Sequence, residues 1–224
     1  MTRSVSCGEA LISLLESYEV DTVFGIPGVH TLDLYRGLAH SNIRHVQARN
    51  EQGAGFMADG YARLGGKPGV CVLISGPGVT NACTPMGQSF ADSIPVLVIS
   101  STTASYSLGK GWGCLHEVTD LEAVTRPLTA LSATARSPDD LEELIGQAFS
   151  IFASERPRPV HIAVPIDVLA QPVSTTWQRR TVPSRPAPAG SAIREAAELL
   201  RQAERPLIYA GGGAVGGEIG KGAS

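Results

Sequence analysis

The sequence predicts an α/β fold: a doubly wound, mostly parallel six-stranded sheet with helices on both faces. Two observations predict it. Short apolar runs alternate with longer segments of helical period, and the runs are apolar throughout. Strands with that composition are typical of parallel sheets covered on both faces. A hydrophobic content of 43% and a charged content of 17% also fit a globular protein with a sizeable core.

Five helices are predicted before residue 170 from apolar residues spaced three and four positions apart. The first covers residues 8–18, because Leu11, Leu14 and Leu15 fall on one face. The others cover residues 31–39, 51–64, 80–91 and 139–153. Ser137, which precedes Pro138, is the predicted N-cap of the last helix.

Six strands are predicted between these helices. They cover residues 20–26, 43–47, 69–74, 95–100, 128–133 and 160–164. The first is closed by Pro27 and Gly28. The stretch 102–119 is irregular and contains several glycines, so we predict a long loop, and long ordered loops are often functional.

The predicted domain organisation follows from a change of composition. Residues 1–170 form one domain, and residues 171–190 are rich in proline, serine and threonine and are interpreted as a linker. A helix over 192–203 and a strand over 206–210 follow, which normally opens a second α/β domain. Only 14 of the 224 residues come after Ala210, so residues 191–224 are interpreted as the truncated start of a central domain.

Charge and residue usage exclude several classes of function. A net charge of -3 and a pI of about 6.0 offer no basic face for nucleic acid. We expect no signal peptide, and no apolar run reaches the roughly 18 residues of a membrane span. Four cysteines without a Cys-x-x-Cys pair fit reduced thiols in a cytoplasmic protein. The five histidines are not spaced as metal ligands, so no metal site is predicted.

Glu51 is the predicted catalytic residue. It follows an apolar segment and opens a helix rich in small residues, with few charges nearby. A carboxylate in such a setting is suited to proton exchange near neutral pH. The alternative is that Glu51 only complements the dipole of its own helix.

The turn Gly76-Pro77-Gly78 follows a predicted strand and precedes a predicted helix. Its glycines would let the backbone pass close to a ligand, and Pro77 restricts the turn. The alternative is an ordinary tight turn. Asn81 falls in the first turn of the predicted helix, where its structural alternative is capping.

Two histidines are candidates for a ligand site. His30 lies just beyond the Pro27-Gly28 turn, at the carboxyl end of the first predicted strand, where α/β folds bind ligands. His116 lies next to Glu117 in the irregular loop. The alternative for His116 is a solvated loop side chain, and for His30 an ordinary position at a helix start.

The glycines near the end of the chain resemble a nucleotide-binding pattern. Gly211, Gly213 and Gly216 match Gly-x-Gly-x-x-Gly after a predicted strand. No convincing helix follows, and no ribose-binding acid can lie about 20 residues further on. We interpret these glycines as a structural turn or the start of a second domain. A nucleotide-binding oxidoreductase is the last of three alternatives for the function.

Five short motifs occur in a fixed order along residues 4 to about 170. They are Gly25-Ile26-Pro27-Gly28, Arg49-Asn50-Glu51-Gln52-Gly53-Ala54, Ala58-Asp59-Gly60-Tyr61-Ala62-Arg63, Gly76-Pro77-Gly78-Val79-Thr80-Asn81 and Ala91-Asp92-Ser93-Ile94-Pro95. Together they resemble the N-terminal, pyrimidine-binding domain of the thiamine-diphosphate enzymes related to acetolactate synthase.

The resemblance implies a role for each matching residue. Glu51 would hydrogen-bond N1′ of the aminopyrimidine, which promotes loss of the C2 proton, and the resulting ylid would attack a 2-oxoacid substrate. The implied cofactor-binding residues are Ile26, Pro27, Gly28, Glu51, Pro77 and Asn81. The implied cofactor is thiamine diphosphate, held through Mg²⁺ by a C-terminal domain whose Gly-Asp-Gly motif this sequence lacks.

The resemblance also bears on the substrate. It is strongest to 2-ketoarginine (5-guanidino-2-oxopentanoate) decarboxylases in residues 25–31, 107–111 and 115–117. His116 replaces the loop glutamine of acetolactate synthases, and Val29 stands where some decarboxylases place a polar catalytic group. The predicted substrate contacts are Val29, His30, His116 and Glu117. A cationic substrate would want a carboxylate, for which Glu117 and Asp120 are candidates.

We therefore predict the N-terminal part of a thiamine-diphosphate-dependent 2-oxoacid decarboxylase or acetolactate synthase-like enzyme, acting as a homodimer or homotetramer. The cofactor would lie between this domain and the C-terminal domain of another subunit. The chain alone is therefore expected to bind thiamine diphosphate weakly and to be inactive. The alternative is a non-catalytic remnant or dimerisation module.

Overall fold

A computed structural model describes residues 5–174 and 176–215. The chain divides into two compact units, Met1–Ser184 and Arg185–Ser224. The larger unit contains the sheet and every predicted site residue.

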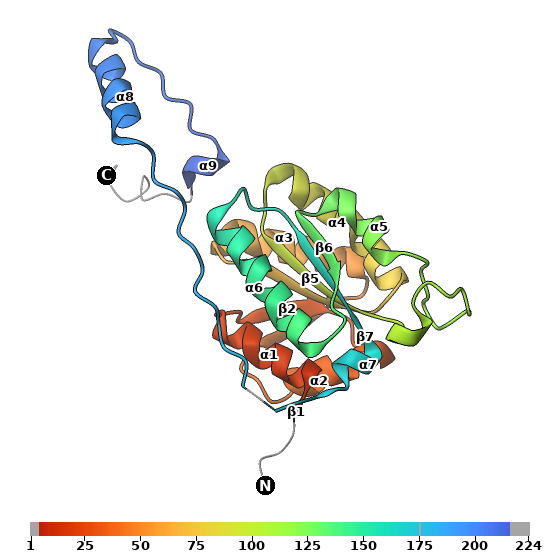
Figure 1. Cartoon of the computed structure of the whole chain (residues 1–224). Helices are drawn as coiled ribbons and strands as arrows, with labels where there is room; N and C mark the ends of the chain where they lie inside the picture. The colour runs from red at the N-terminus through yellow and green to blue at the C-terminus, as the bar shows by residue number, and fades with distance from the viewer. Residues whose placement is uncertain (1–4, 175, 216–224) are drawn as a thin grey trace. The chain divides into compact units, whose positions relative to one another are not determined.

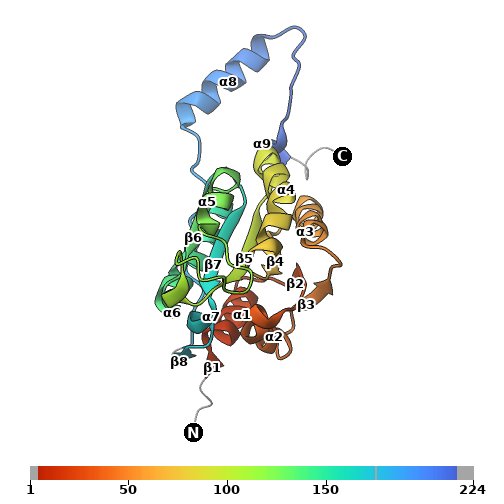
Figure 2. The same cartoon turned by 90° about the vertical axis from the view of Figure 1, so that its right-hand side faces the viewer.

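The larger unit is built on a six-stranded sheet in which every neighbouring pair is parallel. The strand order is β3-β2-β4-β5-β7-β6 (Figures 1 and 2). The strands are β2 (Thr22–Gly25), β3 (Arg44–Gln47), β4 (Gly69–Leu73), β5 (Val96–Thr102), β6 (Leu131–Thr134) and β7 (Val160–Pro165). The predicted fold class is confirmed, although β6 begins later than predicted because a 3-10 turn, η3 (Arg126–Leu128), precedes it.

Helices cover both faces of this sheet (Figures 1 and 2). One face carries α1 (Cys7–Ser17), α2 (Leu32–Leu38), α6 (Pro138–Ser154) and α7 (Ile166–Leu169), and the other carries α3 (Glu51–Gly65), α4 (Pro77–Asp92) and α5 (Leu121–Thr125). The side chains of β4 alternate between the two cores. Val70 and Val72 pack with the first layer, whereas Cys71 and Leu73 pack with the second.

Local capping explains where several helices begin. Ser6 and Glu9 form a capping box on α1, in which each side chain accepts the other residue's backbone N–H. The predicted N-cap Ser137 is found on α6, where its Oγ accepts the N–H of Asp140 at 3.1 Å. Asn50 caps α3 through the N–H of Gln52 at 2.8 Å, which places Glu51 at the first helical position.

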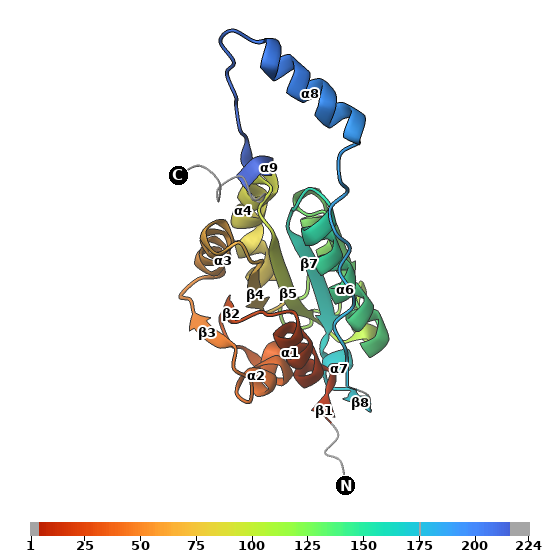
Figure 3. The same ribbon diagram turned by 90° about the vertical axis from the view of Figure 1, so that its left-hand side faces the viewer.

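The shortest elements are not predicted by periodicity. They are the antiparallel pair β1 (Val5–Ser6) and β8 (Pro172–Val173), and the 3-10 turns η1 (Val29–Thr31) and η2 (Ser105–Ser107). Residues 176–184 run along α6 as part of the larger unit (Figure 3). Trp177 is buried there, and the N–H of Arg180 donates to the Tyr18 hydroxyl at 3.0 Å.

The smaller unit contains α8 (Gly190–Gln202) and the short α9 (Gly212–Val215). The predicted helix over 192–203 is confirmed, but the predicted strand over 206–210 is wrong, because those residues are irregular. A strand needs a hydrogen-bonding neighbour, and the described part of this unit provides none. Gly216, the last glycine of the predicted nucleotide pattern, lies outside the described residues.

Among the described helices, none combines the length and the apolar composition that a membrane crossing requires.

Candidate functional site

The candidate site lies where the order of the strands changes direction. The chain passes from β2 to β3 on one side and then returns to β4 on the other side of β2. In open α/β sheets, ligands bind at the carboxyl edge beside such a switch point. The turns that follow β2 and β4 meet at this edge, and they carry most of the predicted cofactor residues.

The turn after β2 packs directly against the chain that leaves β4. A Cβ atom placed on Gly28 would lie 2.6 Å from Cγ2 of Ile74, so a larger residue here would force the Ile74 side chain to shift. The Thr31 hydroxyl accepts the N–H of Gly28 at 3.1 Å and donates to its carbonyl at 3.0 Å. These bonds close the turn, in which Ile26 is half-buried and Pro27 is exposed.

Glu51 and Asn81 are in contact across two helices. Glu51 is 9% exposed, and its Oε2 accepts a hydrogen bond from Nδ2 of Asn81 at 2.9 Å. In the described part of the chain, Oε1 has no hydrogen-bond partner, and Glu51 takes part in no ion pair. The carboxylate is therefore buried, oriented at one oxygen and open at the other.

The capping alternative for Asn81 is wrong. α4 begins at Pro77, three residues earlier than predicted, so Asn81 is the fifth helical residue and its amide reaches across to α3. The helix starts earlier because Pro77 stands at its first position, where the missing N–H costs no hydrogen bond.

The Gly76 turn supports the loop that follows β5. Gly76 has a φ of 56°, and a Cβ atom placed on it would lie 2.3 Å from the carbonyl oxygen of His116. Ser75 donates its hydroxyl to the same carbonyl at 3.2 Å. The loop after β5 is thus seated on the turn after β4, next to the helix that carries Asn81. Sequence reasoning missed Ser75, because a serine at a strand end has no distinctive pattern.

His30 and His116 face each other at the same edge of the sheet. Their ring centroids are 5.8 Å apart at an interplanar angle of 84°. Burial lowers the pKa of His30, and the nearby His116 lowers it further. Nδ1 of His116 is buried and unpartnered within the part of the chain that the structure describes. His116 also has a φ of 59°, an uncommon conformation outside glycine that is often found at functional sites.

The remaining substrate candidates differ in what they contact. Val29 is 71% exposed. Glu117 accepts the N–H of Gly111 at Oε1 and that of Cys114 at Oε2, each at 2.9 Å. These backbone hydrogen bonds, the one from Cys114 first, lower the pKa of Glu117, so it is ionised at neutral pH.

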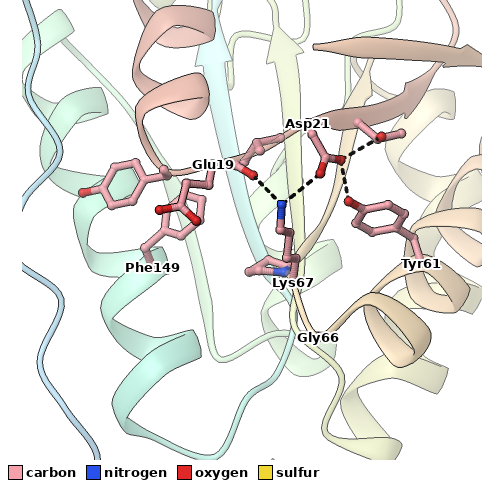
Figure 4. Close-up of a pocket in the computed structure, with 10 residues that line it drawn as sticks. Glu19, Asp21, Tyr61, Gly66, Lys67 and Phe149 are labelled. Atoms are coloured by element: carbon pink, nitrogen blue, oxygen red, sulfur yellow. Dashed lines mark hydrogen bonds and ion pairs between the residues drawn. The ribbon is translucent and has the colours of Figure 1, made fainter. Parts of the chain in front are cut away.

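A separate cavity of about 180 Å³ lies at the opposite, amino edge of the sheet (Figure 4). Asp21, which precedes the first residue of β2, accepts hydrogen bonds from the Tyr61 hydroxyl at 2.5 Å and from Lys67 Nζ at 2.9 Å. The bond from Tyr61 and then that from Lys67 lower the pKa of Asp21 to about 2. Because these polar groups form hydrogen bonds with one another, we interpret the cavity as a structural feature where β2, α3 and β4 meet.

The described residues bring no three histidine, cysteine, aspartate or glutamate side chains together as a metal site. The site consists of glycine turns in close contact, a buried carboxylate with an amide partner, and two imidazole rings that meet edge to face. A doubly wound sheet with such a site at its carboxyl edge defines the class of α/β domains that bind a small organic ligand or cofactor.

Comparison with known proteins narrows this class. Residues 5–124 match the family model described as the thiamine pyrophosphate enzyme, N-terminal TPP binding domain. The chain therefore belongs to the thiamine pyrophosphate enzyme family.

Three curated relatives illustrate the similarity. The chain is 61% identical over 215 residues to a probable 2-ketoarginine decarboxylase, AruI, of Pseudomonas aeruginosa, covering 95% of this chain and 38% of that protein. It is 39% identical over 221 residues to an acetolactate synthase of Mycobacterium bovis, covering 96% and 35%. It is 38% identical over 210 residues to the large subunit of acetolactate synthase isozyme 1 of Escherichia coli K12, covering 92% and 37%. The chain thus spans little more than a third of the length of these relatives.

Proposed function

We propose that this chain forms the pyrimidine-binding part of a thiamine-diphosphate-dependent 2-oxoacid decarboxylase or acetolactate synthase-like enzyme, with Glu51 as its proton-exchanging residue. The observation that carries the proposal is the contact between Glu51 and Asn81. A carboxylate that is 9% exposed and free of ion pairs in the described chain is suited to sharing a proton with a ring nitrogen.

The residues at the carboxyl edge fit a flat heterocycle. Gly28 and Gly76 each lie where an added Cβ atom would collide with a neighbouring residue. The turn after β2 and the turn after β4 are therefore tightly packed at the same edge of the sheet. We propose that Ile26, Pro27 and Gly28 hold one side of the ring, and that Pro77 and Asn81 hold the other. Asn81 occupies Oε2 of Glu51, which leaves Oε1 to hold a proton at N1′ of the aminopyrimidine.

When bound, thiamine diphosphate would supply the electron sink for loss of CO₂ from a 2-oxoacid. This chain would orient the pyrimidine and exchange its proton through Glu51. We expect the diphosphate and its Mg²⁺ to be held by a C-terminal domain of the kind that the resemblance implies, and the working enzyme to be a homodimer or homotetramer.

The proposed substrate is a 2-oxoacid, and the relative named as a 2-ketoarginine decarboxylase favours one with a guanidinium tail. Val29, His30, His116 and Glu117 are the proposed substrate contacts. The lowered pKa of His30 keeps it neutral near pH 7, so it would offer a hydrogen bond to the 2-oxoacid without a full charge.

The test uses thiamine, which carries the pyrimidine and lacks the diphosphate. Backbone amide NMR spectra of the 224-residue chain, titrated with thiamine, should show shifts that cluster at residues 26–28, 51 and 76–81. Glu51→Gln should abolish the shifts, whereas Glu143→Gln, on the exposed side of α6, should leave them unchanged. Equal responses of Glu51→Gln and the unmodified chain would show that Glu51 does not meet the pyrimidine.

A further inference from the structure

The carboxylates suggested for a cationic substrate are both held by backbone groups. Glu117 is held at both oxygens by the N–H groups of Gly111 and Cys114. Oδ1 of Asp120 accepts the N–H of Ala123 at 2.9 Å and caps α5. The backbone N–H groups of Gly113 and Trp112 also lie close enough to lower the pKa of Glu117, so its carboxylate stays ionised at neutral pH. The loop after β5 therefore presents a negative charge in a fixed position.

Trp112 lies in the sequence between Gly111 and Cys114, whose N–H groups donate hydrogen bonds to Glu117. The indole and the carboxylate are thus carried by one short turn of chain. Gly111 and Gly113 flank Trp112 with φ values of 65° and 73°, a left-handed backbone that glycine adopts without strain. The Trp112 side chain is 64% exposed, and exposed aromatic residues of this size are typical of binding surfaces. An indole face attracts a guanidinium ion more strongly than the other aromatic rings do.

Both ends of this loop are anchored at the carboxyl edge of the sheet. At its start, the Asp167 carboxylate accepts the N–H of Ser105 at 2.8 Å and also the Ser105 hydroxyl. At its end, the His116 carbonyl is seated on Ser75 and Gly76. The loop extends beyond the carboxyl end of β5 (Figure 1), which is the edge of the sheet that carries the proposed cofactor residues.

We propose that Trp112 and Glu117 together recognise the cationic end of the substrate, the indole by cation–π attraction and the carboxylate by charge-assisted hydrogen bonds. This inference rests on the proposed function in that it takes the substrate to be a 2-oxoacid. The ligand class is a 2-oxoacid whose side chain ends in a guanidinium or similar planar cation.

The chain itself offers a selective probe. It has two tryptophans, Trp112 and Trp177, of which Trp177 is 6% exposed. In a Trp177→Phe background, all tryptophan emission comes from Trp112. This variant is titrated with 5-guanidino-2-oxopentanoate and, as the uncharged counterpart, with 2-oxohexanoate. We expect a saturating change in emission with the guanidino acid only.

Variants then separate the two parts of the proposed site. Glu117→Gln should weaken the response by about 3- to 10-fold, whereas Glu122→Gln, which removes a nearby charge on α5, should not. Trp112→Leu, followed through broadening of the ligand's NMR signals, should weaken binding by a similar factor. An unsaturable response, equal responses to the two acids, or equal effects of Glu117→Gln and Glu122→Gln would overturn the proposal.

Thiamine binding reports on Glu51 and does not involve Trp112. A thiamine response without a guanidinium response would therefore refute cation recognition and leave the cofactor site standing. The reverse pattern would refute the proposed cofactor site.

Discussion

The buried imidazole of His161 should make the larger unit less stable as the solution is acidified. His161 is completely buried in β7, where its Nε2 is 2.8 Å from the Ser100 hydroxyl and its Nδ1 is 2.9 Å from the Thr125 hydroxyl. Burial lowers its pKa from 6.5 to about 4. The neutral ring satisfies both contacts, whereas a buried imidazolium would lack a counter-charge.

The sign and the size of the effect follow from linkage. In the unfolded chain the ring takes up a proton near its ordinary pKa, whereas in the folded chain it does so only near pH 4. The neutral, buried ring therefore contributes its full stabilisation at pH values above the pKa of the unfolded chain. This stabilisation is lost as the pH falls toward the pKa of His161 in the folded chain. Each pKa unit corresponds to about 1.4 kcal/mol, so His161 contributes a loss of roughly 3 kcal/mol in unfolding free energy by about pH 4.

Urea unfolding followed by circular dichroism, at several pH values between about 7 and 4, measures this loss. His161→Gln lowers the stability at neutral pH but removes the titrating ring, so its stability should fall less steeply with acid. His45→Gln is the matched control, because burial also lowers the pKa of the half-buried His45, and its effect should be smaller. If His161→Gln keeps the full acid dependence of the unmodified chain, the reasoning is refuted.

Three further substitutions test the packing of the site, each by urea unfolding. Gly76→Ala should cost at least about 2 kcal/mol, because it strains a φ of 56° and collides with the His116 carbonyl; a cost near zero would contradict the seating of the loop. Gly53→Ala should instead stabilise by up to about 1 kcal/mol, since an added Cβ meets nothing within 4 Å in α3; a loss would contradict this. Asn81→Ala should destabilise by about 1–2 kcal/mol, because buried Glu51 loses its amide donor; an unchanged stability would show that the bond is not formed in solution.

The parallel sheet is predictable because its strands are buried on both faces. All five residues of β4 are buried, and the sequence there is apolar at every position from Val70 to Ile74. The pairing of β1 with β8 is not predictable in this way. Val5 pairs with Val173, and a two-residue strand carries no period that would reveal a partner so distant in the sequence. The strand predicted over residues 206–210 is wrong for a related reason. An apolar run predicts a strand, but it does not show whether another strand is available to pair with it.

The candidate site is predictable in its composition and less so in its contacts. The order of the motifs predicts Glu51, Asn81 and the Gly76 turn as candidates, but the hydrogen bond from Asn81 to Glu51 depends on where α4 begins. The contact of the loop with the Gly76 turn depends on a left-handed backbone conformation at His116. Histidine rarely adopts this conformation, and no neighbouring residue in the sequence indicates it. The network of His161, Ser100 and Thr125 was also missed, because strand residues of these types have no spacing that points to one another.

The central claim is that the Glu51 carboxylate meets the pyrimidine, and the carbon-13 NMR signal of its carboxyl group measures this most directly. The protein is labelled at the carboxyl carbons of its glutamates, and the Glu51→Gln variant assigns the Glu51 signal. Added thiamine should shift this signal, because a proton is then shared between the carboxylate and the pyrimidine, and a thiazole that lacks the pyrimidine should leave it in place. A Glu51 signal that stays fixed while thiamine shifts backbone amides elsewhere in the chain would contradict the account.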